Sequence, residues 1–286
     1  MISTENWCER MGEDMLLRDF RATTRDSYET SVRMFLQWAK EDPEELREET
    51  VRNYVLYLRE EKKLSPSSIN VASCALRFFF TYTLPRKWPI FDLVRVKIPE
   101  RLPVVLAPAE TRAVLGVIRE PVHRMALTTI YGLGLRLTEG VALKVDQIDS
   151  ARRMVWVRNG KRAKDRAIPL PQPLLIRLRR FWKEERAVSS SPYLFIGSRS
   201  MKPVDKTALQ RTFVAARREI KLVKHASIHT LRHSYATFLL EHGVSLRMIQ
   251  QILGHKCLSS TEVYLHVTQP AMVQVQDVVD RLMAGL

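Results

Sequence analysis

The sequence predicts a mainly α-helical chain with one small β-hairpin, an α+β protein made of an N-terminal helical bundle and a larger, mostly helical C-terminal domain. Apolar residues recur at helical spacing through most of its 286 residues. Asn159-Gly160 stands between two short apolar runs, which is typical of a hairpin. Prolines gathered between residues 85 and 108 separate a nearly neutral first part from a basic remainder.

Four helices are expected over residues 1–84, each from an apolar stripe that returns every three or four residues. Thr23 or Thr24 is the expected N-cap of the second helix. Ser65-Pro66 opens the fourth, because serine caps well and proline fits the first helical turn. The stripes are Trp7, Met11, Met15 and Leu16; Tyr28, Val32, Phe35, Leu36 and Ala39; Val51, Tyr54, Val55 and Leu58; and Ile69, Ala72, Leu76, Phe79 and Phe80.

Residues 85–106 are interpreted as an interdomain linker, since their prolines favour extended chain. The second domain then covers residues 107–286. Two strands are expected at 154–157 and 167–170 on either side of the Asn-Gly turn. Helices are expected to begin near Pro171, Asp205, Ile228, Ser245, Ser259 and Pro270, and the last of them, over 270–284, is an amphipathic tail.

The charge is unevenly distributed. Lys and Arg total 46 against 31 acidic residues, and residues 1–100 hold 16 of the basic and 17 of the acidic side chains. The excess therefore lies in residues 101–286, which points to a polyanion partner, most commonly nucleic acid. No apolar run is long enough to span a bilayer, and the first residues lack the pattern of a secretory signal, so a cytoplasmic location is expected.

Two patterns suggest a cofactor or a metal without supporting one. Gly132-Leu133-Gly134 lacks the third glycine of a dinucleotide fingerprint, and no alternation of strands and helices surrounds it. His225, His229 and His233 have ligand-like spacing, but they stand beside cationic side chains. The three scattered cysteines form neither a disulfide framework nor a zinc site. We expect no cofactor and no metal.

Five motifs of the second domain together hold a set of arginine, lysine, histidine and tyrosine side chains. They are Gly134-Leu135-Arg136-Leu137-Thr138-Glu139; Gly160-Lys161; His229-Thr230-Leu231-Arg232; Leu253-Gly254-His255; and the segment around Tyr264. With these motifs in this order, the chain resembles the tyrosine site-specific recombinases, the family of Xer proteins and of phage and transposon integrases. The resemblance covers residues 107–286 by motif. Two positions depart from the family pattern: Arg162 replaces a glycine and Gly140 a leucine.

The resemblance implies a helical, SAM-like core-binding domain followed by a catalytic domain. It also implies strand cleavage and rejoining through a 3′-phosphotyrosyl bond and a Holliday junction, without metal or ATP. The biological task would be chromosome dimer resolution or integration and excision of a mobile element. The expected partner is double-stranded DNA, bound by a homotetramer, or a heterotetramer with a second recombinase, on two sites. Off DNA a dimer or monomer is expected, and the tail helix packs in cis or in trans.

The chemistry assigns a role to each side chain. The phenol of Tyr264 has an ordinary pKa near 10, so it must lose its proton as it attacks phosphorus. Arg136 and Arg232 suit the non-bridging oxygens, because guanidinium is planar and permanently charged. Lys161, or alternatively Lys164, would protonate the departing 5′ oxygen. The remaining roles fall to His229 as base or orienting group, His255 as hydrogen-bond donor and Glu139 as a supporting residue.

Further basic residues are expected to hold DNA phosphates with little regard to sequence. Two alternatives share part of this description. A type IB topoisomerase-like enzyme would relax DNA by the same chemistry, and a DNA-binding protein without activity would form no covalent adduct. The expected phosphate contacts are Arg162, Lys164 and Arg166 in the hairpin and Lys202, Lys206 and Arg211 beyond it.

Overall fold

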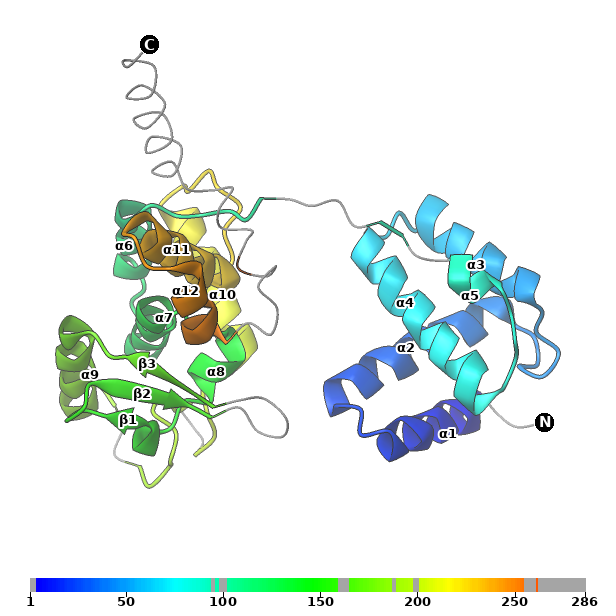
Figure 1. The fold of residues 1–286 in the computed structure, drawn as a ribbon, viewed down its shortest axis with the longest axis horizontal. Coiled ribbons are helices and arrows are strands. Elements are labelled where there is room, and N and C mark those ends of the chain that lie inside the picture. Colours follow the sequence, from blue (N-terminus) through cyan, green and yellow to red (C-terminus); the bar gives the residue numbers. More distant parts are fainter. Residues whose placement is uncertain are drawn as a thin grey trace, which may run out of the picture. The chain divides into compact units, whose positions relative to one another are not determined.

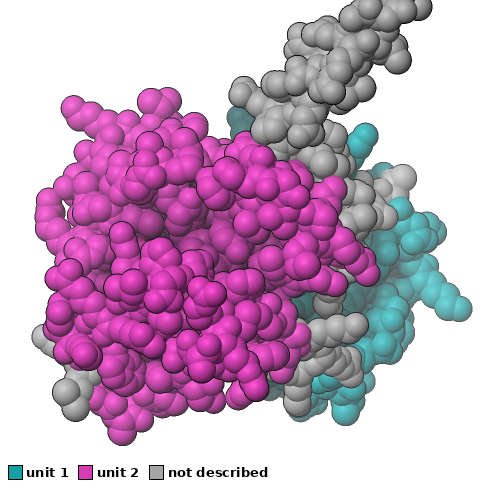
Figure 2. All heavy atoms as spheres, turned by 60° about the vertical axis from the view of Figure 1, so that its left-hand side comes forward, with its two compact units in different colours: residues 1–100 teal, residues 101–286 magenta. Residues whose placement is uncertain are grey.

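The computed structural model describes residues 4–93, 96–97, 102–158, 165–186, 189–197, 201–254 and 261. The chain divides into two compact units, residues 1–100 and residues 101–286 (Figures 1 and 2). Each unit has a hydrophobic core of its own. No helix within the described ranges is long and apolar enough to cross a membrane.

The first unit is a bundle of helices around an aromatic core. Its elements are α1 (Thr4–Leu17), α2 (Ala22–Ala39), α3 (Glu48–Glu60), α4 (Pro66–Phe78), a π-helical turn (Phe79–Thr83) and α5 (Ile90–Leu93). Most of the predicted stripes supply the core: Met11, Met15, Phe35, Leu76 and Phe80 are all fully buried, whereas Leu16 of the first stripe is 60% exposed. The ring of Phe35 meets those of Tyr54 and Phe80 at centroid distances of 5.1 and 6.0 Å.

The starts of these helices show which capping predictions were right. Ser65 caps α4 as expected, since its hydroxyl accepts a hydrogen bond from the Ser68 amide at 3.2 Å. The cap expected at Thr23 or Thr24 was wrong, because α2 already begins at Ala22 after an extended Arg21. No side chain caps that end of α2, so the helix start there depends on packing of Val32, Phe35 and Leu36 further along.

The first part of the predicted linker packs on the first unit. Ile90 and Phe91 are buried in its core, and the ring of Trp88 lies 4.5 Å from that of Phe80. Pro89 immediately precedes α5, so proline here starts a short helix and does not keep the chain extended. Large apolar side chains between the prolines explain the difference from the sequence-based prediction.

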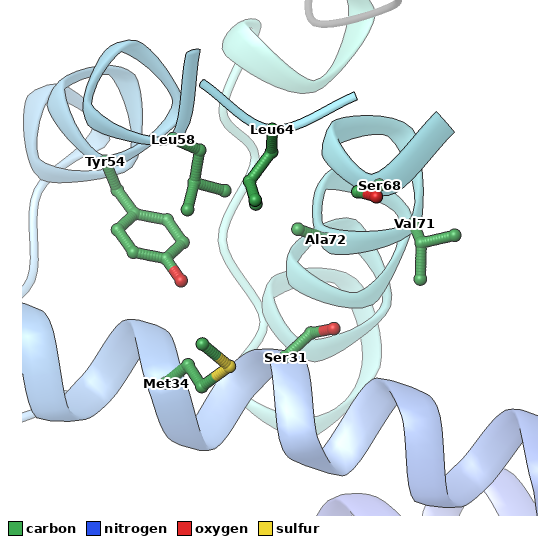
Figure 3. A pocket seen from close by; sticks show the side chains of 8 residues that line it. All are labelled: Ser31, Met34, Tyr54, Leu58, Leu64, Ser68, Val71 and Ala72. Carbon is green, nitrogen blue, oxygen red and sulfur yellow. The ribbon is translucent and has the colours of Figure 1, made fainter. Parts of the chain in front are cut away.

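A pocket of about 260 Å³ lies between α2, α3 and α4 of the first unit. Figure 3 shows Tyr54 and Leu58 from α3 facing Met34 from α2 across it. Its other lining residues are Ser31, Leu64, Ser68, Val71 and Ala72. The predicted catalytic residues all belong to the second unit.

The second unit is built around α7 (Pro121–Leu133), a helix buried on most of its surface. It contacts helices before and after it in the sequence, which Figure 1 shows around it. The elements are α6 (Pro108–Gly116), α7, α8 (Leu137–Val141), a 3-10 turn (Val145–Gln147), β1 (Ile148–Asp149), β2 (Met154–Val157), β3 (Arg166–Pro169), α9 (Gln172–Glu184), α10 (Lys206–Glu219), α11 (Ile228–Glu241) and α12 (Leu246–Leu253).

The three strands form one antiparallel sheet in the order β1-β2-β3. The hairpin was predicted, although β3 begins one residue earlier than expected, at Arg166 opposite Val157. The two-residue strand β1 was not predicted, because so short a pairing leaves no alternating pattern. Arg166 and Ile168 alternate with outward positions along β3, and both are buried.

Candidate active site

A bend between α7 and α8 places Arg136 at the start of α8. Gly134 ends α7 with φ +59°, a left-handed conformation that favours glycine. A Cβ there would collide with the ring of Tyr235 and lie 3.0 Å from Leu253. The bend therefore needs glycine for its backbone and also for its close approach to α11 and α12.

Glu139 is the carboxylate around which the predicted arginines gather. The amide of Arg136 donates to its Oε2 at 2.8 Å, which fixes the first turn of α8. Nη1 of Arg136 donates to Oε1 at 2.9 Å. Arg232 approaches Oε2 at 3.9 Å. The side chain of Glu139 is 7% exposed and that of Arg136 is 38% exposed, so the pair opens to solvent on the arginine side.

Arg232, on α11, is buried to 1% exposure. Its Nη1 donates to the carbonyl of Gly134 at 2.8 Å, across 98 residues of sequence. Its Nη2 donates to the carbonyl of Leu253 at 2.7 Å. These bonds hold the guanidinium between the bend before α8 and the end of α12, as burial of a charge requires.

The end of α12 is surrounded by arginines. Helices leave their last carbonyls without partners in the helix, and the partial negative charge there favours cations. Three consecutive carbonyls each accept from a different arginine: Ile252 from Arg166 at 2.6 Å, Leu253 from Arg232 at 2.7 Å and Gly254 from Arg136 at 3.1 Å. Segments far apart in sequence are therefore joined immediately before His255.

Arg166 differs from the sequence-based prediction of a DNA contact. Its side chain is 7% exposed, and its Nη1 and Nη2 donate to the two oxygens of Glu139 at 3.0 and 2.8 Å. The reason is its place on β3, since it shares the inward face with Ile168. Alternation along the strand was the signal that could have identified it as buried.

The cluster carries an excess of positive charge. Burial by itself would raise the pKa of Glu139, but the hydrogen bond and charge of Arg166, followed by the amide and charge of Arg136, outweigh it and lower that pKa to about 2. Glu139 is thus ionised at neutral pH. Three guanidiniums around one carboxylate leave a net charge of +2, which suits an anionic group such as a phosphodiester.

Comparison with known proteins shows the family of the chain. Residues 105–270 match the model of the phage integrase family, and residues 7–90 match that of the phage integrase N-terminal SAM-like domain. The chain is 33% identical to the tyrosine recombinase XerA of Pyrococcus furiosus over 244 residues, which are 83% of this chain and 84% of that protein. The chain belongs to the tyrosine recombinases of the phage integrase family.

Two further likenesses extend over almost the whole recombinase. It is 41% identical to a putative integrase/recombinase of Sinorhizobium fredii over 260 residues, 91% of this chain and 83% of that one. Its fold matches that of the Tn1549 transposon integrase, solved in complex with transposon right end DNA, with a TM-score of 0.73 and 20% identity. That match covers 96% of this chain and 99% of the other. The predicted fold class is confirmed.

His229 of the recombinase lies one turn before Arg232 on α11. Its imidazole meets that of His233 edge to face at 4.5 Å between centroids. Partial desolvation of the imidazole by surrounding protein atoms, followed by the positive charges of Arg232 and Arg136, lowers the pKa of His229. The residue as a whole is nevertheless exposed. Burial, followed by His229 and Arg232, lowers the pKa of His233 to about 4. The lowered pKa of His229 favours its neutral form.

The remaining predicted residues of the recombinase fall into two groups. Lys202, Lys206 and Arg211 are exposed on and before α10, so their charges face solvent. Five predicted site residues lie outside the described ranges: Tyr264, His255, Lys161, Arg162 and Lys164. The structure therefore brings together Arg136, Glu139, His229 and Arg232, and it adds Arg166, Gly134 and Gly254 to them.

Proposed function

We propose that this recombinase cuts and rejoins DNA strands at specific sites, with Tyr264 as the nucleophile. The phenol oxygen of Tyr264 attacks phosphorus, and a 3′-phosphotyrosyl bond forms. The bond from phosphorus to the 5′ oxygen breaks, and the 5′ hydroxyl departs with a proton. Because the new ester conserves the phosphodiester as a covalent bond, the reverse attack by a 5′ hydroxyl needs no ATP.

The observation that carries this proposal is the arrangement of Arg136, Arg232 and the end of α12 around Glu139. In the proposal, the non-bridging oxygens of the scissile phosphate bind beside Arg136, whose side chain is partly exposed. Arg232, which is buried beside Glu139, adds positive charge to the site. Charge on these oxygens grows in the pentacoordinate transition state, so a preorganised cationic site accelerates the reaction more than it stabilises the bound substrate.

The proton transfers are assigned by residue type and charge state. A neutral imidazole accepts a proton, so the lowered pKa of His229 favours its role as general base for Tyr264. Lys161, at the hairpin expected around Asn159-Gly160, donates a proton to the departing 5′ oxygen. His255, the residue after Gly254, donates a hydrogen bond to the phosphate. The steps at His229 and Lys161 each move one proton, whereas the hydrogen bond from His255 moves none, and no bound metal is required.

We further propose that both units contact one DNA duplex. The first unit serves as the core-binding domain, and the exposed cations Lys202, Lys206 and Arg211 of the second contact phosphates. Strand exchange takes place between two sites in a tetramer and passes through a Holliday junction. The Tn1549 integrase and this chain share a fold, and that protein was solved on transposon DNA, which supports the same kind of substrate here.

A two-site recombination assay tests the proposal. Two linear duplexes of different length, each carrying a site recovered by covalent capture, are incubated with the full chain. Strand exchange yields two duplexes of new length. If the chain relaxes a supercoiled plasmid but yields no exchange between the linear duplexes, it is a topoisomerase. If it binds the duplexes but does not cleave them, it is a DNA-binding protein.

A further inference from the structure

The guanidinium of Arg166 bonds two different parts of the cluster, the carboxylate of Glu139 and the end of α12. Two of its nitrogens donate to Glu139 at 3.0 and 2.8 Å, and its Nε donates to the carbonyl of Ile252 at 2.6 Å. The side chain thus connects β3, α8 and the end of α12 at a single point. Such a two-point bond fixes orientation as well as distance, which a lysine would not reproduce.

Gly254 lies against the same guanidinium. A Cβ added to Gly254 would come within 3.1 Å of both Cδ and Nη1 of Arg166, and its φ of +67° also favours glycine. The carbonyl of Gly254 accepts from Arg136 at 3.1 Å. Arg166 therefore packs against Gly254, and Arg136 bonds the carbonyl of the same residue. His255 is the next residue in the sequence.

Arg136 and Arg166 share the carboxylate of Glu139. Oε1 accepts from Nη1 of each arginine at 2.9 and 3.0 Å, and Oε2 accepts from the amide of Arg136 and Nη2 of Arg166 at 2.8 Å each. If Arg166 were neutral, the positive excess of the cluster would fall from +2 to +1 and the carboxylate would pair chiefly with Arg136. Arg136 would then have less charge to offer a phosphate.

We propose that Arg166 is a positioning residue of the recombinase: it holds Glu139 and the end of α12 so that Arg136 and the segment entering His255 meet the scissile phosphate. The inference rests on the proposed function. Arg166 is the first residue of β3, and Lys161 precedes that strand in the sequence. Arg166 acts through its neighbours and touches no DNA.

The test compares Arg166→Gln and Arg166→Lys in the full chain with a matched control, Arg186→Gln. Arg186 is equally buried at 8% exposure and donates to backbone carbonyls of Leu194, Ser191 and Tyr193, away from the cluster. Single-turnover cleavage and binding anisotropy are measured on a nicked duplex carrying a site that the wild type captures. Thermal unfolding is measured for every variant.

Arg166→Gln is expected to slow cleavage by about 10²-fold, because small misplacements of catalytic groups have effects of this size. Its affinity for the duplex is expected to stay within about threefold of the wild-type value, which is under 1 kcal/mol. Arg166→Lys should recover part of the rate, since it restores the charge without the two-point bond. Arg186→Gln should unfold at lower temperature while its folded fraction cleaves at the wild-type rate.

Three results would overturn the inference. A loss of affinity with an unchanged cleavage rate would make Arg166 a DNA contact. If Arg166→Gln lowers the unfolding temperature but leaves the cleavage rate and the affinity unchanged, the role of Arg166 is structural only. If Arg166→Gln does not fold, a wild-type cleavage rate in Arg166→Lys would exclude positioning. Failure of the wild type itself to cleave the nicked duplex would count against the proposed function, and is thereby distinguished from failure of this inference.

Discussion

Arg136 donates a hydrogen bond to the carbonyl of Gly254, 118 residues further along the chain, at 3.1 Å. The bond joins the first turn of α8 to the residue that precedes His255. Together with the bonds from Arg232 to Gly134 and Leu253, it ties three of the recombinase motifs into one rigid cluster.

Replacement of Arg232 by lysine should reduce cleavage by about 10²–10³-fold, the effect of removing one donor from a preorganised anion site. A lysine keeps the charge but cannot bond the carbonyls of Gly134 and Leu253 in the same fixed plane. Single-turnover cleavage of a nicked duplex measures the effect. The control is Arg180→Lys, at an exposed arginine of α9 paired with Glu184. Equal rates for both variants would contradict a role for Arg232.

Glu139 should contribute to stability in a defined pH range. The pKa of Glu139 is lowered to about 2 in the folded state, so its ionisation adds to the free energy of unfolding above pH 4.5. This added stability is lost as the pH falls towards 2. A shift of this size corresponds to about 3 kcal/mol. Urea unfolding of the wild type and Glu139→Gln from pH 7 to pH 2.5 measures it. The difference between the two proteins should shrink as the pH falls, and a difference independent of pH would show that the charge is not responsible.

The bend at Gly134 should tolerate no side chain. Gly134→Ala requires alanine at φ +59° and displaces Tyr235, which should lower the free energy of unfolding by about 1–3 kcal/mol. It should also slow cleavage, because the carbonyl of Gly134 accepts a hydrogen bond from Arg232. The matched control is Gly116→Ala at the end of α6, where a Cβ would meet nothing within 4 Å. Thermal unfolding and single-turnover cleavage are compared. If both alanine variants behave alike, the bend is not strained.

His229 should determine how the cleavage rate falls as the pH is lowered. Because partial burial, followed by the charges of Arg232 and Arg136, lowers the pKa of His229, a rate that depends on its neutral form should begin to fall at a lower pH than an ordinary imidazole would give. Single-turnover cleavage from pH 5 to pH 8 shows where the fall begins. His229→Gln should lower the rate and remove its dependence on pH in this range. A variant that kept the wild-type profile would exclude His229 as the base.

Local signals in the sequence predicted much of the fold. Asp205 and Ser245 cap α10 and α12 where expected, each accepting from the amide three residues on at 2.7 and 3.3 Å. Packing of Trp88, Ile90 and Phe91 on the first unit was missed, because proline content says nothing of which core an apolar side chain joins.

The site was predicted less completely. Motif spacing selected Arg136 and Arg232 as candidates, since the proposed chemistry demands their residue types. It misplaced Arg166, because a basic residue in a basic hairpin resembles a DNA contact unless the strand register is known. The carbonyls of Gly134 and Leu253 could not be predicted either, since any residue has a carbonyl and only the fold directs it.

Covalent capture tests the central claim most directly. The full chain is incubated with pooled source DNA in EDTA and denatured in SDS, and the DNA that stays attached to protein is sequenced. We predict an adduct for the wild type and for Tyr82→Phe, which changes an exposed tyrosine of the first unit, and none for Tyr264→Phe. An adduct that persists in Tyr264→Phe, or none from the wild type even on nicked duplexes, would contradict cleavage by Tyr264.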